Sequence, residues 1–221
     1  MWAIIPVKNL TGAKQRLSAA LNPQERYDLY HAMLTDVLFA LADTPTLNGI
    51  ALITRDTEAK QLAAKFGAEI ITEAENNGQT SAVHRGIVEL MARGVKSILQ
   101  VPGDVPLATA AEFSQVIAAH LPAPAMTIVP ARDQQGSNCI VCSPPNSVAL
   151  RFGDNSFFPH LEAARQVNIE PTVVPLPGLG LDIDSPADLK VLIGQPAETL
   201  SQTYLAESGI AARLQQEQKS A

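Results

Sequence analysis

The feature that most constrains the fold is a regular alternation of short apolar runs with longer helical patterns. In the first half of the chain, β-branched runs predict strands at 2–6, 49–54, 68–72 and 97–101. Helical patterns separate them at 22–43, 57–66 and 80–93. This order predicts right-handed βαβ units, and so an α/β fold with a mostly parallel sheet flanked by helices. Ligands bind such sheets at the carboxyl ends of the strands, so the loops after Pro6, Thr72 and Val101 are expected to share one rim.

The second half of the chain carries shorter pieces. Helices are predicted at 109–120 and 156–167, and strands at 126–130, 138–143, 172–176 and 179–183. These pieces suit a substrate-binding extension of the same sheet, so we predict one domain over residues 1–195. A tail at 196–221 has the pattern of amphipathic helices, with apolar residues at Leu200, Tyr204, Ile210 and Leu214. We expect this tail to pack on the domain and to contribute to a homodimer.

Composition and charge limit the classes of partner. Apolar residues make up 46% of the 221 residues, enough for a large core. The net charge of −6 argues against a nucleic-acid binder or a protein of anionic membrane surfaces, because both gain affinity from a basic face. Lys8 interrupts the first apolar stretch early, and no run approaches the roughly 20 residues of a membrane span. We therefore expect a soluble, cytoplasmic protein.

The two cysteines are spaced like a redox or zinc pair but fall in the apolar run "NCIVCS". An odd offset on a strand sends Cys139 and Cys142 to opposite faces. Two separately buried thiols are therefore the preferred interpretation, and a paired site is the alternative.

The loop after the first predicted strand is cationic. Nucleotide-binding loops usually meet phosphate with glycine-rich backbone, whereas "VKNLTGAKQR" has one glycine, Gly12. It offers instead Lys8, Lys14 and Arg16. Because the chain as a whole is acidic, this local charge indicates an anion site built from side chains.

Aspartates follow two other predicted strands. Asp104 lies in "PGD" just beyond a buried strand, where a plain Pro-Gly turn is the alternative. Asp182 and Asp184 are two apart on a strand pattern, so their carboxylates leave one face about 6.5 Å apart. Like charges on one face repel unless a cation lies between them, and carboxylates with phosphate oxygens are typical Mg²⁺ ligands. Capping of a following helix by Ser185 accounts for part of the motif but not for Asp182.

Together the cationic loop and the aspartates indicate phosphoryl or nucleotidyl transfer, in which positioning and charge neutralisation do most of the catalysis. The cations would hold a polyphosphate and the aspartates the bridging metal.

Three further segments offer weaker signals. "ENNGQTSAV" opens a helix after a strand and gives Gly78, Gln79 and Ser81 access to a base or ribose, although an ordinary helix start fits as well. "DQQGSN" fits a hairpin turn. "RFGDNSFFPH" places Gly153 and Ser156 at a helix start, as an anion site or as a structural cap. His160 follows on that helix and is interpreted as a hydrogen-bonded core or rim histidine.

These motifs occur in an order that resembles the 2-phospho-L-lactate guanylyltransferase family. The resemblance spans about residues 3–189 and rests on "IPVKNLTGAKQRLS", "GQTSAVHRG", "PGDVPL", "QGSNCI", "FGDNSFFPHLEAA" and "LDIDSPADL". It implies the nucleotidyltransferase fold of the glycosyltransferase-A type and a role in making a deazaflavin coenzyme. Members differ in whether their acceptor is phospholactate, phosphoenolpyruvate or phosphoglycerate. Ser137 stands where the family commonly has threonine.

The resemblance also implies roles for individual residues. Asp104, Asp182 and Asp184 would bind Mg²⁺, and Ser137, Gly153 and Ser156 would surround the phosphorylated acid. Lys8, Lys14 and Arg16 would lie near the phosphates, with Asp104 completing the catalytic group, while Gly78, Gln79 and Ser81 would contact the nucleotide with Lys8 and Arg16. The expected reaction transfers GMP from GTP to a small phosphorylated three-carbon acid. The alternatives are another nucleotide, a sugar phosphate acceptor, or a non-catalytic nucleotide-binding domain.

Overall fold

The computed structural model describes residues 1–73 and 78–219, which form a seven-stranded sheet flanked by helices. The strands are β1 (Trp2–Pro6), β2 (Gly49–Ile53), β3 (Glu69–Ile71), β4 (Ile98–Gln100), β5 (Ala125–Pro130), β6 (Ser137–Ser143) and β7 (Thr172–Val173). Their order across the sheet is β3-β2-β1-β4-β6-β5-β7. The mostly parallel sheet is confirmed, since in the described part of the chain only β6 runs against its neighbours.

The order of the strands creates a crevice between β1 and β4. The chain moves outward from β1 to β2 and β3, and then crosses back so that β4 pairs with the other side of β1. At such a switch point the loops leaving the two central strands diverge, which opens a ligand site beyond their carboxyl ends. The cationic loop follows β1 and the Asp104 loop follows β4, so both open on this crevice.

The predicted strand at 179–183 is wrong, and the predicted strand at 172–176 is reduced to β7. The backbone of this segment bonds within turns and to a neighbouring loop: Gly180 N–H donates to the Leu176 carbonyl over 2.8 Å. A Cβ on Gly178 would lie 2.2 Å from the carbonyl oxygen of Leu107. Glycine is therefore required for this close approach, and the alternation of apolar residues that resembles a strand belongs to a tightly packed turn.

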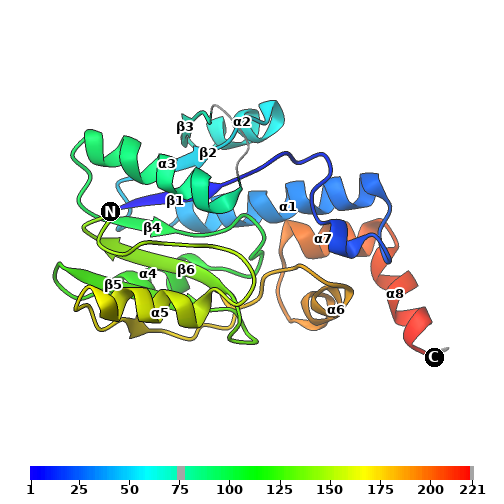
Figure 1. Cartoon of the computed structure of the whole chain (residues 1–221). Coiled ribbons are helices and arrows are strands. Elements are labelled where there is room, and N and C mark those ends of the chain that lie inside the picture. The colour runs from blue at the N-terminus through cyan, green and yellow to red at the C-terminus, as the bar shows by residue number, and fades with distance from the viewer. Residues whose placement is uncertain (74–77, 220–221) are drawn as a thin grey trace.

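Helices cover both faces of the sheet and form two separate cores. They are α1 (Pro23–Ala42), α2 (Thr57–Ala64), α3 (Gln79–Ala92), α4 (Ala110–Ala118), α5 (Phe157–Gln166), α6 (Pro186–Gly194), α7 (Leu200–Glu207) and α8 (Ile210–Lys219), with a 3-10 turn η1 (Gln15–Leu17). Figure 1 shows α3 and α5 in front of the sheet and α1 and α4 behind it. Cys139 belongs to the core on the α1 side and Cys142 to the core on the α3 side, which confirms two separately buried thiols.

Two helix starts follow their sequence signals and place functional loops. Asn22 and Glu25 form a reciprocal capping box at the start of α1, with Pro23 in the first turn. Ser185 and Asp188 do the same for α6. Because this cap fixes where α6 begins, it also fixes the end of the loop that carries Asp182 and Asp184.

The C-terminal helices pack against α1. Leu205, Ile210 and Leu214 lie in the core on the α1 side, whereas Leu200 is 45% exposed. The Asp36 carboxylate of α1 accepts hydrogen bonds from the backbone N–H groups of Leu200 and Ser201, at 2.8 and 3.0 Å. The tail as far as Leu214 thus shares a core with the sheet, and the boundary at residue 195 stays a prediction. No helix in the described ranges is long and apolar enough to cross a bilayer.

Candidate active site

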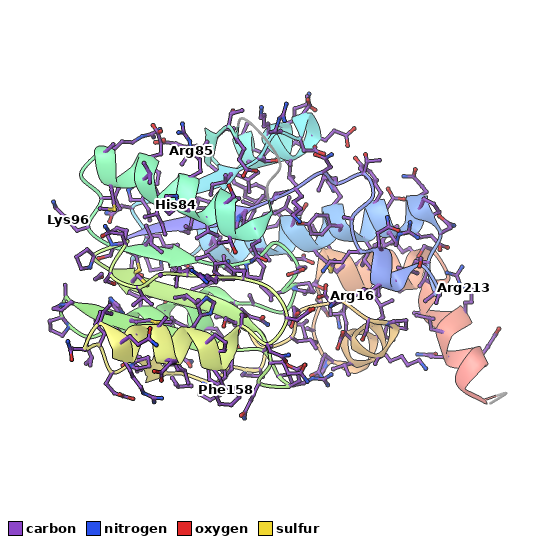
Figure 2. The ribbon with its side chains drawn as sticks, in the orientation of Figure 1. Arg16, His84, Arg85, Lys96, Phe158 and Arg213 are labelled. Atoms are coloured by element: carbon purple, nitrogen blue, oxygen red, sulfur yellow. The ribbon has the colours of Figure 1, made fainter. Side chains whose placement is uncertain are left out.

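Two adjoining cavities open at the carboxyl edge of the sheet. The first, of about 520 Å³, lies against the loop after β1, and the second, of about 880 Å³, extends to the loop 152–156 that precedes α5. Six residues line both cavities: Lys8, Arg16, Gln79, Pro102, Asp104 and Asp184. Figure 2 shows Arg16 at this edge of the sheet and Lys96 at the opposite edge. The shared lining makes the two cavities neighbouring parts of one site.

The loop after β1 is held in a fixed conformation by local contacts. Gly12 and Lys14 both have positive φ angles, 80° and 56°, so the chain turns sharply before η1. Gln15 Nε2 donates to the Gly12 carbonyl over 2.8 Å. The Asp56 carboxylate accepts from Leu10 N–H over 2.9 Å and also caps α2. This geometry directs the Lys14 side chain inward.

Lys14 lies between two of the aspartates. Its ammonium forms ion pairs with Asp104 and with Asp184, the latter at 2.7 Å, and its side chain is only 7% exposed. Burial lowers the pKa of Lys14, but the two carboxylates outweigh burial and leave that pKa raised. Burial also raises the pKa of Asp184, and the charge of Lys14 reverses this effect, so its pKa lies below the ordinary value. Lys14 and Asp184 are therefore both charged at neutral pH.

Arg16 and Lys8 keep their charge accessible. Arg16 is mostly exposed and bridges the two cavities, with Nη2 at 3.1 Å from Asp154 and Nη1 at 3.6 Å from Asp184. Lys8 is exposed and lines both cavities. Exposed ion pairs contribute little to stability, so Arg16 can turn from its carboxylates to an anionic ligand at small cost.

Asp182 faces the second cavity rather than Lys14. Its carboxylate accepts a hydrogen bond from Asn138 Nδ2 at 3.0 Å. Burial, and then the charge of Asp104, raise the pKa of Asp182 to about 6, although the Asn138 hydrogen bond opposes the shift. Ile183 N–H donates to the Asp104 carbonyl over 3.0 Å, which joins the two aspartate loops. Asp104, Asp182 and Asp184 thus lie on one rim, although the predicted strand at 179–183 does not form.

The donor atoms at this rim suit a hard cation, although their present arrangement holds an ammonium. Among the described residues, no three acidic, histidine or cysteine side chains are close enough to hold a metal ion as they stand. Asp104 Oδ1, however, is buried without a hydrogen-bond partner in the described structure. Burying a carboxylate oxygen without a hydrogen-bond partner costs free energy. Lys14 already supplies a positive charge beside this carboxylate. The carboxylates therefore fit Mg²⁺ in chemistry and charge, provided that Lys14 moves away.

The predicted acceptor residues come together in the second cavity. Ser137 and Ser156 are buried, and Ser156 Oγ donates to Ser137 Oγ over 3.4 Å. Gly153 lines the same cavity with a φ of 153° and nothing near its missing Cβ. Ser156 precedes α5 but makes no side-chain cap, so the structural alternative for its hydroxyl is wrong. His160 is buried with both ring nitrogens hydrogen-bonded, as predicted.

The predicted nucleotide residues are only partly brought to the cavities. Gln79 lines both cavities, whereas Gly78 and Ser81 line neither of them. Gly78 has a φ of 93° and begins α3 without a side-chain cap, which leaves backbone N–H groups at this helix end. Glu75, Asn76 and Asn77 of the same motif lie outside the described residues.

Sequence reasoning missed three partners of the site. Asn138 holds Asp182, and Asp154 pairs with Arg16. Thr80 Oγ1 accepts from Phe152 N–H over 2.9 Å and so joins the start of α3 to the loop that carries Gly153. Asn138 and Asp154 lie inside motifs that the sequence singles out, but their partners are distant in sequence and have no local signal.

Comparisons with known proteins identify the family of the chain. Residues 1–221 match the family model described as "Guanylyl transferase CofC like". A phosphoenolpyruvate guanylyltransferase of Roseiflexus castenholzii is 37% identical over 207 residues, 94% of each chain. A 2-phospho-L-lactate guanylyltransferase of Methanothermobacter thermautotrophicus is 32% identical, covering 92% of this chain and 88% of that protein.

A solved structure agrees with the fold. The putative nucleotide-diphospho-sugar transferase of Desulfovibrio desulfuricans G20 has a TM-score of 0.77, with 96% of this chain and 97% of that one covered. Its sequence is 16% identical, so the likeness concerns the fold alone.

Proposed function

Because the chain belongs to the family of guanylyl transferase CofC like proteins, we propose that it transfers GMP from GTP to a small phosphorylated acid. The acceptor class is a three-carbon acid, with phosphoenolpyruvate as the first candidate, since the relative with 37% identity is named for that acid. 2-Phospho-L-lactate and 3-phospho-D-glycerate are the other candidates. A homodimer stays a prediction.

One observation carries this proposal: a cationic cavity and a hydroxyl-lined cavity share the aspartate rim. The first has Lys8, Lys14 and Arg16 within reach of a triphosphate. The second has Ser137, Gly153 and Ser156 within reach of a smaller anion. Two anionic substrates can therefore meet beside Asp104 and Asp184, as nucleotidyl transfer requires.

The reaction needs no protein nucleophile. An oxygen of the acceptor's phosphate attacks the α-phosphorus of GTP, the bond from that phosphorus to the bridging oxygen breaks, and pyrophosphate leaves. The acceptor phosphate is largely ionised at pH 7, because its second pKa is about 6. The protein's task is to orient the two anions and to neutralise their charge, and Lys8 and Arg16 are the accessible cations for it.

Mg²⁺ is part of the proposal. Asp104, Asp182 and Asp184 would hold it, and bound there it would neutralise charge on the triphosphate. Lys14 balances Asp104 and Asp184 in its absence and is the group that must give way. Freed from the carboxylates, the Lys14 ammonium is available to the phosphates in the same cavity.

The test is pyrophosphate release from a full matrix of substrates. The purified chain is mixed with Mg²⁺, each of GTP, ATP, CTP and UTP, and each of the three acids or a sugar phosphate. We expect release with GTP and at least one three-carbon acid, and none without acceptor or after chelation by EDTA. Release with another nucleotide or with the sugar phosphate alone would favour the alternative transferases. Nucleotide binding without release in any mixture would favour a binding domain.

A further inference from the structure

His160 connects the acceptor cavity to the backbone behind it. It lies on α5 with 1% of its surface exposed. Its Nε2 accepts a hydrogen bond from the backbone N–H of Arg151 over 2.9 Å, and its Nδ1 lies 2.9 Å from Ser137 Oγ. Both ring nitrogens therefore have one fixed neighbour each.

These neighbours determine which nitrogen carries the proton. A backbone N–H can only donate, so Nε2 must be the unprotonated nitrogen. Burial lowers the pKa of His160 to about 4, which keeps the ring neutral near pH 7. A neutral imidazole has one N–H, and here it must be on Nδ1. His160 therefore donates to Ser137, and Ser137 Oγ accepts.

Ser137 receives a second donor from the other side. Ser156 Oγ donates to it over 3.4 Å, so two hydrogen bonds point at the Ser137 oxygen. Apart from the Ser156 oxygen, no hydrogen-bond acceptor for the O–H of Ser137 is found among the described residues, and Ser137 lines the second cavity. An oxygen of a bound anion would accept that proton.

The register of the sheet explains how Ser137 reaches His160. The pairing of β5 with β6 shifts between Val129 and Pro130, so that Ser137 pairs with Pro130 while Cys139 pairs with Val129. A shift of this kind re-aims the side chains beside it. Ser137 consequently meets α5, although Cys139, two residues on, is buried on the α1 side.

We propose that His160 is a positioning residue for the acceptor: its Nδ1–H fixes Ser137 as a hydroxyl donor aimed at a phosphate or carboxylate oxygen in the second cavity. The inference rests on the proposed function and deepens it. It makes the cavity selective for a group that accepts hydrogen bonds, without adding a positive charge.

A second histidine, the partly buried His120, shows what a closed hydrogen-bond network is like. His120 contacts Thr127 Oγ1 at 2.9 Å and Ser143 Oγ at 2.8 Å, and Ser143 donates to Ser97 over 2.7 Å. None of these residues lines either cavity of the rim. His120 therefore provides a matched control: a partly buried histidine whose ring contacts hydroxyl groups away from both cavities.

The test separates the two ring nitrogens by substitution. In His160→Asn, the side-chain amide can occupy the position of Nδ1 and donate to Ser137. In His160→Gln, the amide can occupy the position of Nε2, which leaves Ser137 without its donor. We expect Ser137→Ala and His160→Gln each to raise the acceptor KM about tenfold, the size of a lost hydrogen bond to an anion, with GTP KM unchanged. His160→Asn should stay within about threefold of the unmodified chain. The double variant Ser137→Ala/His160→Gln should be no worse than either single one.

Other outcomes overturn the inference. An unchanged acceptor KM in His160→Gln, or equal losses for GTP and acceptor in both His160 variants, would assign the ring to packing alone. His120→Gln should lower thermal stability and leave the acceptor KM unchanged, and an equal KM effect there would also count against the inference. If the unmodified chain releases no pyrophosphate with any acid, the proposed function fails first and the inference with it.

A measurement on the unmodified chain does not depend on any variant folding. In nitrogen-15 spectra of the imidazole rings, the His160 signals should be those of the tautomer with its proton on Nδ1. Signals of the other tautomer would overturn the proposed direction of the hydrogen bond.

Discussion

The loop after β1 and the Ser137–Ser156 side of the second cavity lie on the same rim but offer ligands different chemistry. The loop carries full charges, and Lys14 and Arg16 are already paired with carboxylates. The second cavity adds to the charged residues of the rim two neutral hydroxyls, those of Ser137 and Ser156, which are aligned by a neutral imidazole. Charged groups interact over long range and respond to salt, whereas aligned hydroxyls act only at contact. The loop is thus suited to neutralising a polyphosphate, and the cavity to discriminating between small acids.

The largest loss of turnover is expected at Asp104, which lines both cavities. Asp104→Asn removes a negative charge that pairs with Lys14 and is a proposed metal ligand. We expect turnover to fall roughly hundredfold or more while the chain still folds. Asp154→Asn is the matched control, since Asp154 is an exposed rim carboxylate paired with Arg16, and it should cost less than about threefold. Steady-state pyrophosphate release and circular dichroism measure both, and near-normal turnover in Asp104→Asn would remove the aspartates from the mechanism.

A charged loop should give losses that depend on salt. Lys8→Ala and Arg16→Ala should each weaken GTP binding about tenfold in low salt, because each removes a charge-assisted contact, and by less as the salt concentration rises. Calorimetry at two ionic strengths measures this. Lys96→Ala, at the opposite edge of the sheet (Figure 2), serves as the control and should leave the affinity unchanged. Affinities equal to that of the unmodified chain would make the loop a solvated surface.

The hydroxyls of the second cavity should give a smaller loss, which is specific to the acceptor. Ser156→Ala removes one of the two donors to Ser137 and should raise the acceptor KM by up to about tenfold, with little dependence on salt. GTP KM should change little. Steady-state kinetics with all three acids provide the measurement. An equal rise in KM for GTP and for every acid would contradict the assignment of the acceptor to the second cavity.

The smallest effect concerns stability in the absence of Mg²⁺. The pKa of Asp182 is raised to about 6, so the folded chain binds this proton more tightly than the unfolded chain, and the ionised carboxylate costs stability above that pH. Asp182→Asn keeps an oxygen for Asn138 and removes the charge. It should raise stability by on the order of 1–2 kcal/mol at pH 7.5, and the gain should shrink as the pH falls from 7 to 4. Thermal melts with EDTA across this pH range provide the check. A gain in stability that grows toward low pH would contradict the prediction.

Much of the fold and many site positions could be predicted from local patterns. The strands up to residue 143 follow from apolar runs, and Lys8, Asp104 and Ser156 follow from the ends of elements. The segment 179–183 could not, because its alternation is that of a strand while Gly178 packs against Leu107 and Gly180 against Leu176. The inward position of Lys14 depends on a left-handed backbone and on carboxylates 90 and 170 residues away, which no local pattern records.

The partners within the acceptor cavity show the same limit. Ser137 is evident from its motif, but its contact with His160 depends on a register shift between two strands. Gly78 and Ser81 were placed by their motif near the nucleotide, yet among the described residues only Gln79 of that trio lines the cavities. A motif identifies the segment, and tertiary packing selects which of its side chains reach the ligand.

Asp56 connects the cationic loop to α2, a helix that lines neither cavity. The same carboxylate accepts from Glu58 N–H and Ala59 N–H at the start of α2 and from Leu10 N–H in the loop. Local opening of α2 would remove the anchor of the loop, so we expect the two segments to exchange hydrogen as one cooperative unit. The backbone amides of Leu10 and Ala59 are then expected to have similar protection factors, although 48 residues separate them in sequence.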